Sequence, residues 1–167
     1  MTSVELFEES LEWLKNNYSR FTFYLERDIV FTLQTYLNDL IKKNSLPIKV
    51  YNDYPILPGT NNRRHLCADL AIKTDDAVDV AVEFKYEPDH ERKNTDILLS
   101  RLPVVVWSGE CSISKDIERA CKYVHENKAR HAYSILIDEG GHFRQREPFP
   151  GSAWQDWKDV AALIARF

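Results

Sequence analysis

The chain is poor in glycine and cysteine and has no surplus of basic residues. Its five glycines form no glycine-rich loop, so a nucleotide-binding phosphate loop is excluded. The three cysteines, Cys67, Cys111 and Cys121, form no CxxC pair and are odd in number, which argues against a disulfide framework. The formal net charge of -4 means that any binding of nucleic acid must come from a local basic patch.

Long hydrophobic runs are also missing. The first residues lack a basic segment followed by an apolar one, so we expect no signal peptide. No stretch approaches the roughly 20 apolar residues that cross a bilayer. The length of 167 residues, with 44% hydrophobic and 29% charged residues, is that of one globular domain over residues 1–167. We therefore expect a cytoplasmic protein that does not bind membranes.

Helical periodicity predicts two helices at the N-terminal end. Thr2 and Glu5 have the spacing of a capping box, and apolar residues then recur at helical spacing over residues 3–18. A second helix is expected over about residues 22–43, with a continuous apolar stripe. Glu26 lies on the stripe side of that helix. Taken alone, Glu26 is explained as a first-turn carboxylate that the helix dipole favours.

The remaining elements are predicted from β-rich runs, turn residues and caps. Ser114 is expected to cap a helix that ends near residue 128. Apolar residues from Trp154 to Phe167 recur at helical spacing, which predicts a last helix over residues 152–166. Strands are expected at 48–57, in a hairpin over 66–86, at 132–138 and, after a glycine turn, at 142–146. The predicted order is α-α-β-β-β-α-β-β-α.

The hairpin carries charged residues inside apolar strands. Asp69, Glu83 and Lys85 stand where a purely structural strand would have aliphatic residues, and burying such charges alone is costly. Side chains alternate across a strand, so Glu83 and Lys85 share a face. Asp69 shares that face only if paired residue numbers sum to an even value, which requires an odd-numbered turn, such as Asp75-Asp76-Ala77. A two-residue turn without a bulge would separate Asp69 from Glu83.

Two carboxylates on neighbouring strands can serve as oxygen ligands for Mg²⁺, which keeps several waters and reaches substrate phosphate. A lysine two residues after Glu83 can approach the same point and counter charge in a phosphoryl transition state. The alternative is a salt-bridged strand pair, in which Lys85 only neutralises Asp69 or Glu83. Both interpretations stay open from the hairpin alone.

Asp69, thirteen intervening residues and then Glu83-Phe84-Lys85 resemble the D…(D/E)xK signature of the PD-(D/E)xK phosphodiesterase superfamily, the restriction-endonuclease-like nucleases. The family's shared core has the order α-β-β-β-α-β, and the order predicted over about residues 20–140 is similar. The helices at 3–18 and 152–166 would be additions. The resemblance implies a three-layer α/β (α+β) fold with a central mixed sheet flanked by helices.

The resemblance also implies a role for each residue. In the family the first acid and the Glu of ExK bind a divalent metal, Mg²⁺ or Mn²⁺, and the Lys acts on the attacking water. An acid on the first core helix often completes the site. These roles fall on Asp69, Glu83, Lys85 and Glu26 respectively, so the implied metal ligands are the three acids. The family's Pro before the Asp is Ala68 here.

Four further residues are candidates for contacts to substrate phosphate. Several branches of the family carry Gln-x-x-x-Tyr on the following helix, where this chain has Arg119 and Tyr123. Either residue could approach phosphate, or Tyr123 could simply pack. Arg63 and Arg64 lie at the mouth of the hairpin, where the planar guanidinium suits phosphate oxygens. Such a basic pair is otherwise an ordinary solvated loop.

The expected function is divalent-metal-dependent, endonuclease-like hydrolysis of nucleic acid through a metal-activated water, with DNA favoured over RNA. A homodimer is a further expectation, since small nucleases that cut two strands are often dimeric. One alternative is a weak or inactive nuclease-fold module that binds or regulates. Another is a small structural α/β protein with salt-bridged strands, which convergence of Glu26, Asp69, Glu83 and Lys85 on one cleft would argue against.

Overall fold

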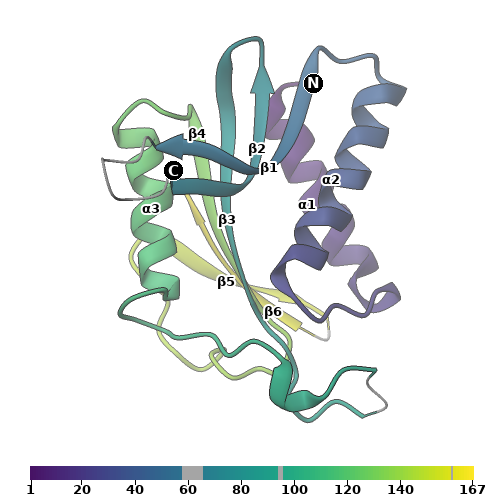
Figure 1. Ribbon diagram of the computed structural model, residues 1–167, viewed down its shortest axis with the longest axis vertical. Coiled ribbons are helices and arrows are strands. Elements are labelled where there is room, and N and C mark those ends of the chain that lie inside the picture. The colour runs from purple at the N-terminus through teal and green to yellow at the C-terminus, as the bar shows by residue number, and fades with distance from the viewer. Residues whose placement is uncertain (58–65, 94–95, 159) are drawn as a thin grey trace.

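The computed structural model describes residues 1–57, 66–93, 96–158 and 160–167 (Figure 1). A six-stranded mixed sheet forms its centre, with the strand order β1-β2-β3-β4-β6-β5. Among the strands of the described residues, only β3 and β4 are parallel neighbours. The strands are β1 (Ile48–Leu57), β2 (Leu66–Thr74), β3 (Ala77–Glu87), β4 (His131–Asp138), β5 (Ser152–Trp157) and β6 (Val160–Arg166), and the α-helices of the described residues are α1 (Ser3–Asn17), α2 (Glu26–Lys43) and α3 (Ile113–His125).

The helices form layers on the two faces of the sheet. Helices α1 and α2 lie together on one face and α3 lies on the other (Figure 1). The larger core joins α1 and α2 to one face of the sheet, while the second core joins Ala120 and Tyr123 of α3 to Ala71, Ala81 and Ala132. The predicted three-layer α+β fold with a central mixed sheet is confirmed. No helix in the described ranges has the length and apolar character needed to cross a membrane.

Both N-terminal helices begin with side-chain contacts to the backbone. The predicted capping box of α1 is present, because the Thr2 hydroxyl accepts from the Glu5 amide and the Glu5 carboxylate accepts from the Thr2 amide. Helix α2 begins at Glu26, four residues later than predicted. The Asp28 carboxylate accepts hydrogen bonds from the Tyr24 and Leu25 amides, so the chain before Glu26 stays extended. Glu26 is therefore the first residue of α2.

The β2–β3 hairpin reaches the predicted register by a different route. Its turn has two residues, Asp75 and Asp76, so the expected odd-numbered turn is wrong. Thr74 pairs with Ala77 at the turn, but the register shifts by one residue further along, and Ile72 pairs with Val80. The extra residue in β3 is Asp79, which makes this shift a β-bulge. The bulge restores the even sum that puts Asp69 and Glu83 on one face.

The bulge residue is held by contacts from two other segments. The Ser3 hydroxyl donates to Asp79 Oδ2 at 2.8 Å, and Arg130 Nη1 lies 2.5 Å from Asp79 Oδ1. Burial raises the pKa of Asp79, but hydrogen bonds from Thr74 and Ser3 and the charge of Arg130 outweigh it and leave the pKa below its usual value. The ionised carboxylate thus joins the bulge to α1 and to the segment before β4.

The predicted C-terminal helix over residues 152–166 is wrong, because these residues form the antiparallel pair β5 and β6. Strand β6 also pairs with β4 and is buried on both faces. Val160, Ala162 and Ile164 face the larger core, whereas Leu163 faces a third cluster with Leu136. The sequence of a strand that is buried on both faces is a continuous apolar run. Periodicity alone cannot distinguish such a run from a buried helix.

Three smaller predictions also differ from the structure. Helix α3 begins at Ile113 because the Ser112 hydroxyl, rather than that of Ser114, accepts from the Lys115 amide. The helix ends at His125 instead of residue 128. The predicted strand at 142–146 is a series of turns, since the Asp138 carboxylate accepts from three successive amides of residues 142–144.

We predict that Asp79→Asn lowers the free energy of unfolding at pH 7 by about 1–3 kcal/mol, because a charged hydrogen-bond acceptor is lost from a buried position. A depressed carboxylate pKa contributes stability above the unfolded value near 4, and that contribution disappears as the pH falls through the folded value. The difference between wild type and variant should therefore shrink below about pH 4. Urea unfolding at several pH values measures it.

Asp76→Asn, at an exposed position of the same turn, is the matched control. It should change stability by less than about 0.5 kcal/mol. Equal losses in the two variants would contradict the assigned role of Asp79.

Candidate active site

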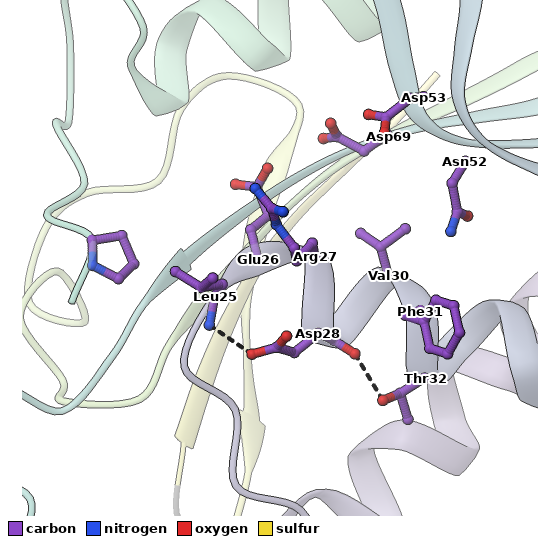
Figure 2. Close-up of a pocket in the computed structure, with 11 residues that line it drawn as sticks. Leu25, Glu26, Arg27, Asp28, Val30, Phe31, Thr32, Asn52, Asp53 and Asp69 are labelled. Carbon is purple, nitrogen blue, oxygen red and sulfur yellow. Dashed lines mark hydrogen bonds between the residues drawn. The ribbon is translucent and has the colours of Figure 1, made fainter. Parts of the chain in front are cut away.

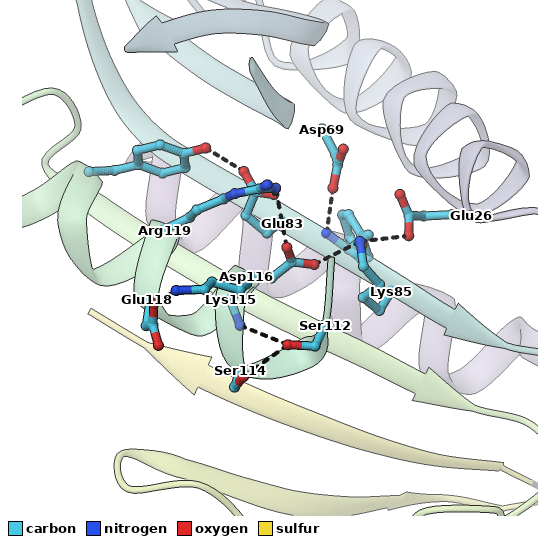
Figure 3. Close-up of polar contacts among 12 residues, drawn as sticks. Glu26, Asp69, Glu83, Lys85, Ser112, Ser114, Lys115, Asp116, Glu118 and Arg119 are labelled. Atoms are coloured by element: carbon cyan, nitrogen blue, oxygen red, sulfur yellow. Dashed lines mark hydrogen bonds and ion pairs between the residues drawn. The ribbon is translucent and has the colours of Figure 1, made fainter. Parts of the chain in front are cut away.

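Charged side chains from α2, β2, β3 and α3 gather above the middle of the sheet (Figure 3). Asp69 and Glu83 lie across from each other on β2 and β3, because Leu70 pairs with Val82 in the same register. Asp69 is fixed by the Phe84 amide, which donates to Asp69 Oδ2 at 2.7 Å. Glu83 is 2% exposed, so its carboxylate is almost removed from water. The strand pairing thus brings two carboxylates to one face.

Lys85 forms the centre of the ion pairs. Its Nζ lies 2.8 Å from Asp116 Oδ2 and 3.5 Å from Glu26 Oε2, and it donates to the Phe84 carbonyl at 3.2 Å. Asp116 Oδ2 accepts no aligned hydrogen bond from the described residues, so its contact with Lys85 is an ion pair. The ammonium of Lys85 joins α2 to α3 across the top of β3.

Helix α3 supplies the contacts that hold Glu83. Tyr123 donates a hydrogen bond to Glu83 Oε1, and Arg119 Nη1 lies 3.5 Å from Glu83 Oε2. The same guanidinium nitrogen lies 3.3 Å from Asp116 Oδ1. Arg119 and Tyr123, which the sequence suggested for substrate phosphate, therefore lie at the site but bind its carboxylates. Their role towards phosphate stays a prediction.

Two acidic residues of this region were missed in the sequence. Asp116, 1% exposed, precedes Arg119 by three residues and Tyr123 by seven, so the three share one face of α3. That helical spacing is the signal that could have identified it. Asp53 lies between the pairs Asn52–Leu70 and Tyr54–Ala68 of β1 and β2, and hence across from Asp69.

The crowded carboxylates have raised pKa values. Burial, followed by the charge of Asp69, raises the pKa of Glu83 to about 8. Burial and then the charge of Asp69 raise the pKa of Glu26 to about 7. Burial raises the pKa of Asp69 to about 6, although the bond from the Phe84 amide opposes the shift. Like charges in a poorly solvated site account for all three shifts.

The basic residues do not balance these acids. Burial lowers the pKa of Lys85, but the charges of Glu26, Asp116 and Asp69 raise it by more. The net pKa is above its usual value, so the ammonium stays protonated. The cluster contains two cationic side chains, Lys85 and Arg119. It contains four carboxylates, those of Glu26, Asp69, Glu83 and Asp116. With every group ionised, these six side chains carry a formal charge of 2 - 4 = -2. This is the charge that one divalent cation neutralises.

The donor chemistry fits Mg²⁺ through Asp69 and Glu83. Hard oxygen ligands suit this ion, and it is commonly bound by one or two protein carboxylates while keeping several waters. No group of three or more His, Cys, Asp or Glu side chains within the described ranges is arranged to hold a metal ion. Glu26 as a third ligand stays a prediction, since in this structure its carboxylate contacts Lys85.

A cleft of about 730 Å³ opens beside the cluster. Glu26 and Asp69 of the cluster line it, and its other lining residues include Arg27, Phe31, Asn52 and Asp53 (Figure 2). The first two turns of α2 and the middle parts of β1 and β2 therefore form much of its wall. Glu26 and Asp69 are accessible from this side, which a purely internal salt-bridge network would not require.

A basic rim around the site would favour binding of nucleic acid, and the structure describes only some of the arginines that could form one. Arg63 and Arg64 lie outside the described residues. Arg130 binds Asp79 near the turn end of β3, and Arg144 lies 3.0 Å from Asp156 on β5. Lys85, Arg119 and Arg27 are the basic residues that the described structure places beside the carboxylates.

Comparisons with known proteins provide no relative. No protein-family model, curated protein or solved structure matches the chain. The assignment of a function therefore depends on the geometry and charge of the site.

We predict that the metal-free protein loses stability as the pH rises from about 4.5 to 8. Because the folded pKa values of Glu26, Asp69 and Glu83 are raised, the folded state retains protons that the unfolded chain has released. The free energy of unfolding should fall by roughly a few kcal/mol in total across this range, since each tenfold difference in proton affinity corresponds to about 1.4 kcal/mol. Urea unfolding in EDTA at several pH values measures the slope.

Glu83→Gln should flatten this dependence, because Gln does not ionise and can still accept the bond from Tyr123. Glu118→Gln, on the exposed side of α3, should keep the wild-type slope. Identical slopes for wild type and Glu83→Gln would contradict the assigned electrostatics.

Proposed function

We propose that this protein is a divalent-metal-dependent nuclease of the PD-(D/E)xK, restriction-endonuclease-like type. The observation that carries the proposal is the buried charge cluster with a formal excess of two negative charges, open to a cleft. The D…ExK spacing, the carboxylates on adjacent strands and the lysine two residues after Glu83 support the same assignment. Nucleic acid is the proposed substrate, with DNA favoured over RNA.

Asp69 and Glu83 are the residues that would hold the ion, Mg²⁺ or Mn²⁺. When bound, such an ion acts as a Lewis acid on the phosphoryl oxygen and makes water a better nucleophile at neutral pH. Arg119 and Tyr123 would orient Glu83 and fix the direction of its carboxylate. Glu26, whose side chain is 33% exposed, would accept the proton that the attacking water releases.

Lys85 would act as a hydrogen-bond donor and a positive charge. Its contacts with Glu26 and Asp116 keep the ammonium protonated, so it is unsuited to abstracting a proton. From this position it can orient water and counter the charge that develops on the phosphoryl oxygens. Asp116, buried beneath the ammonium, would position Lys85 without touching substrate.

A second candidate function is a binding or regulatory module on the same fold, with hydrolysis lost. The favouring observation is that Lys85, Arg119 and Tyr123 already bind the carboxylates of the site. In that case the charge cluster serves to join β3 to α2 and α3.

We further propose that the protein is cytoplasmic. Cys111 and Cys121 are exposed thiols, which suit a reducing compartment. A homodimer is proposed as the form that acts on two strands.

We predict that the protein cleaves nucleic acid in Mg²⁺ or Mn²⁺ and that EDTA abolishes cleavage. Asp69→Ala and Lys85→Ala should each lower the rate by about 10²–10⁴, because each removes a group that holds the reacting atoms or stabilises their charge. Gel assays on single- and double-stranded DNA and RNA measure the rate.

Lys122→Ala, which removes an exposed lysine of α3 paired with Glu126, is the matched control and should cut like wild type. An inert wild type on all substrates, or equal activity of all variants, would mean that the protein is not a nuclease. The binding-module candidate would then take precedence.

A further inference from the structure

The cleft beside the candidate site has one wall formed by the first turns of α2. Arg27 and Phe31 both line it and lie four residues apart, so they occupy one face of the helix (Figure 2). Side chains with this spacing have Cβ atoms about 5–6 Å apart. A cation and an aromatic ring on the same wall can contact the phosphate and the base of a bound nucleotide.

Phe31 is 65% exposed. A single exposed apolar residue is ordinary. This one, however, lies in the same cleft as Glu26 and Asp69, and an exposed ring face is a platform on which a base can stack. Leu25, also in this wall, is 38% exposed and extends the apolar surface.

The opposite wall offers a hydrogen-bond acceptor without a donor. The Asn52 amide nitrogen donates to Gln34 at 2.8 Å, while Asn52 Oδ1 is buried and accepts no hydrogen bond from the residues that the structure describes. Buried polar atoms are normally satisfied. Asn52 lines the cleft, and although its Oδ1 is enclosed in this structure, rotation of the amide would bring this acceptor to a donor on a base edge.

The acidic lining of the cleft disfavours a duplex more than a single strand, because a duplex brings more phosphates to it. A duplex presents two phosphate chains and hides its base faces, and it requires several cations along its path. Arg27 is the only basic residue lining the described cleft, whereas Glu26, Asp28, Asp53 and Asp69 are acidic. An unpaired nucleotide needs fewer phosphate contacts and gains stacking on Phe31. The positive end of the α2 dipole adds a further attraction for one phosphate.

We propose that the cleft binds unpaired nucleotides, so that single-stranded nucleic acid or an unpaired end is the substrate class. Phe31 stacks on a base, Arg27 contacts the adjacent phosphate and Asn52 accepts a hydrogen bond from a base edge. This inference rests on the proposed nuclease function and specifies its substrate.

The test is fluorescence anisotropy with a labelled single strand of about 12 nucleotides and with the corresponding duplex, both phosphorothioate-linked to resist hydrolysis, in Mg²⁺. The single strand should bind at least about tenfold more tightly than the duplex. Phe31→Ala should weaken single-strand binding by about tenfold, and Phe31→Trp should preserve it. Tyr51→Ala removes an exposed aromatic outside the cleft and should bind like wild type.

Equal affinity for the single strand and the duplex, no binding of either, or an unchanged single-strand affinity in Phe31→Ala would overturn the inference. Thermal unfolding of each variant checks that Phe31→Ala is folded, and Phe31→Trp tests stacking without removing the ring. Parallel cleavage assays with ordinary DNA and RNA separate the two proposals. Selective, Phe31-dependent binding without any cleavage would refute only the nuclease function. Equal cleavage of single-stranded and duplex substrates, by both wild type and Phe31→Ala, would refute only the substrate class.

Discussion

The site depends on one irregularity in the pairing of β2 with β3. Without the bulge at Asp79, the two-residue turn would place Asp69 and Glu83 on opposite faces of the sheet. The bulge has its own support, since Ser3 and Arg130 hold the carboxylate of Asp79. Contacts near the turn thereby determine which side chains meet several residues further along the strands.

The consequence of that register is a concentration of like charge. The cluster of Asp69 and Glu83 also includes Glu26 from α2 and Asp116 from α3. Lys85 and Arg119 neutralise only part of the negative charge of these four carboxylates. Such a cluster opposes folding at neutral pH unless a cation compensates it. A structural salt bridge would need fewer carboxylates, and it would not need the cleft that exposes Glu26 and Asp69. This arrangement is the basis for our proposal that the cluster binds a cation.

Much of this could be predicted from the sequence. Charges inside apolar strands identified Asp69, Glu83 and Lys85, and helical spacing put Glu26 on the side of α2 that faces the core. Asp116 escaped notice because an acid in the first turn of a helix is ordinary, and only its burial against Lys85 distinguishes it. The bulge could not be predicted, since its partners, Ser3 and Arg130, are distant in sequence. The last two strands were mistaken for a helix because β6 is apolar on both faces, so alternation was lost.

The central claim is that the carboxylate cluster holds a divalent cation, and calorimetric titration of Mg²⁺ or Mn²⁺ into metal-free protein tests it most directly. The account predicts saturable binding near one ion per chain, with proton release that is larger at pH 6 than at pH 8.5 because the carboxylates are partly protonated at the lower pH. Asp69→Asn should abolish the binding, while Asp76→Asn should leave it intact. Absence of binding in wild type, or equal binding by Asp69→Asn, would contradict the account.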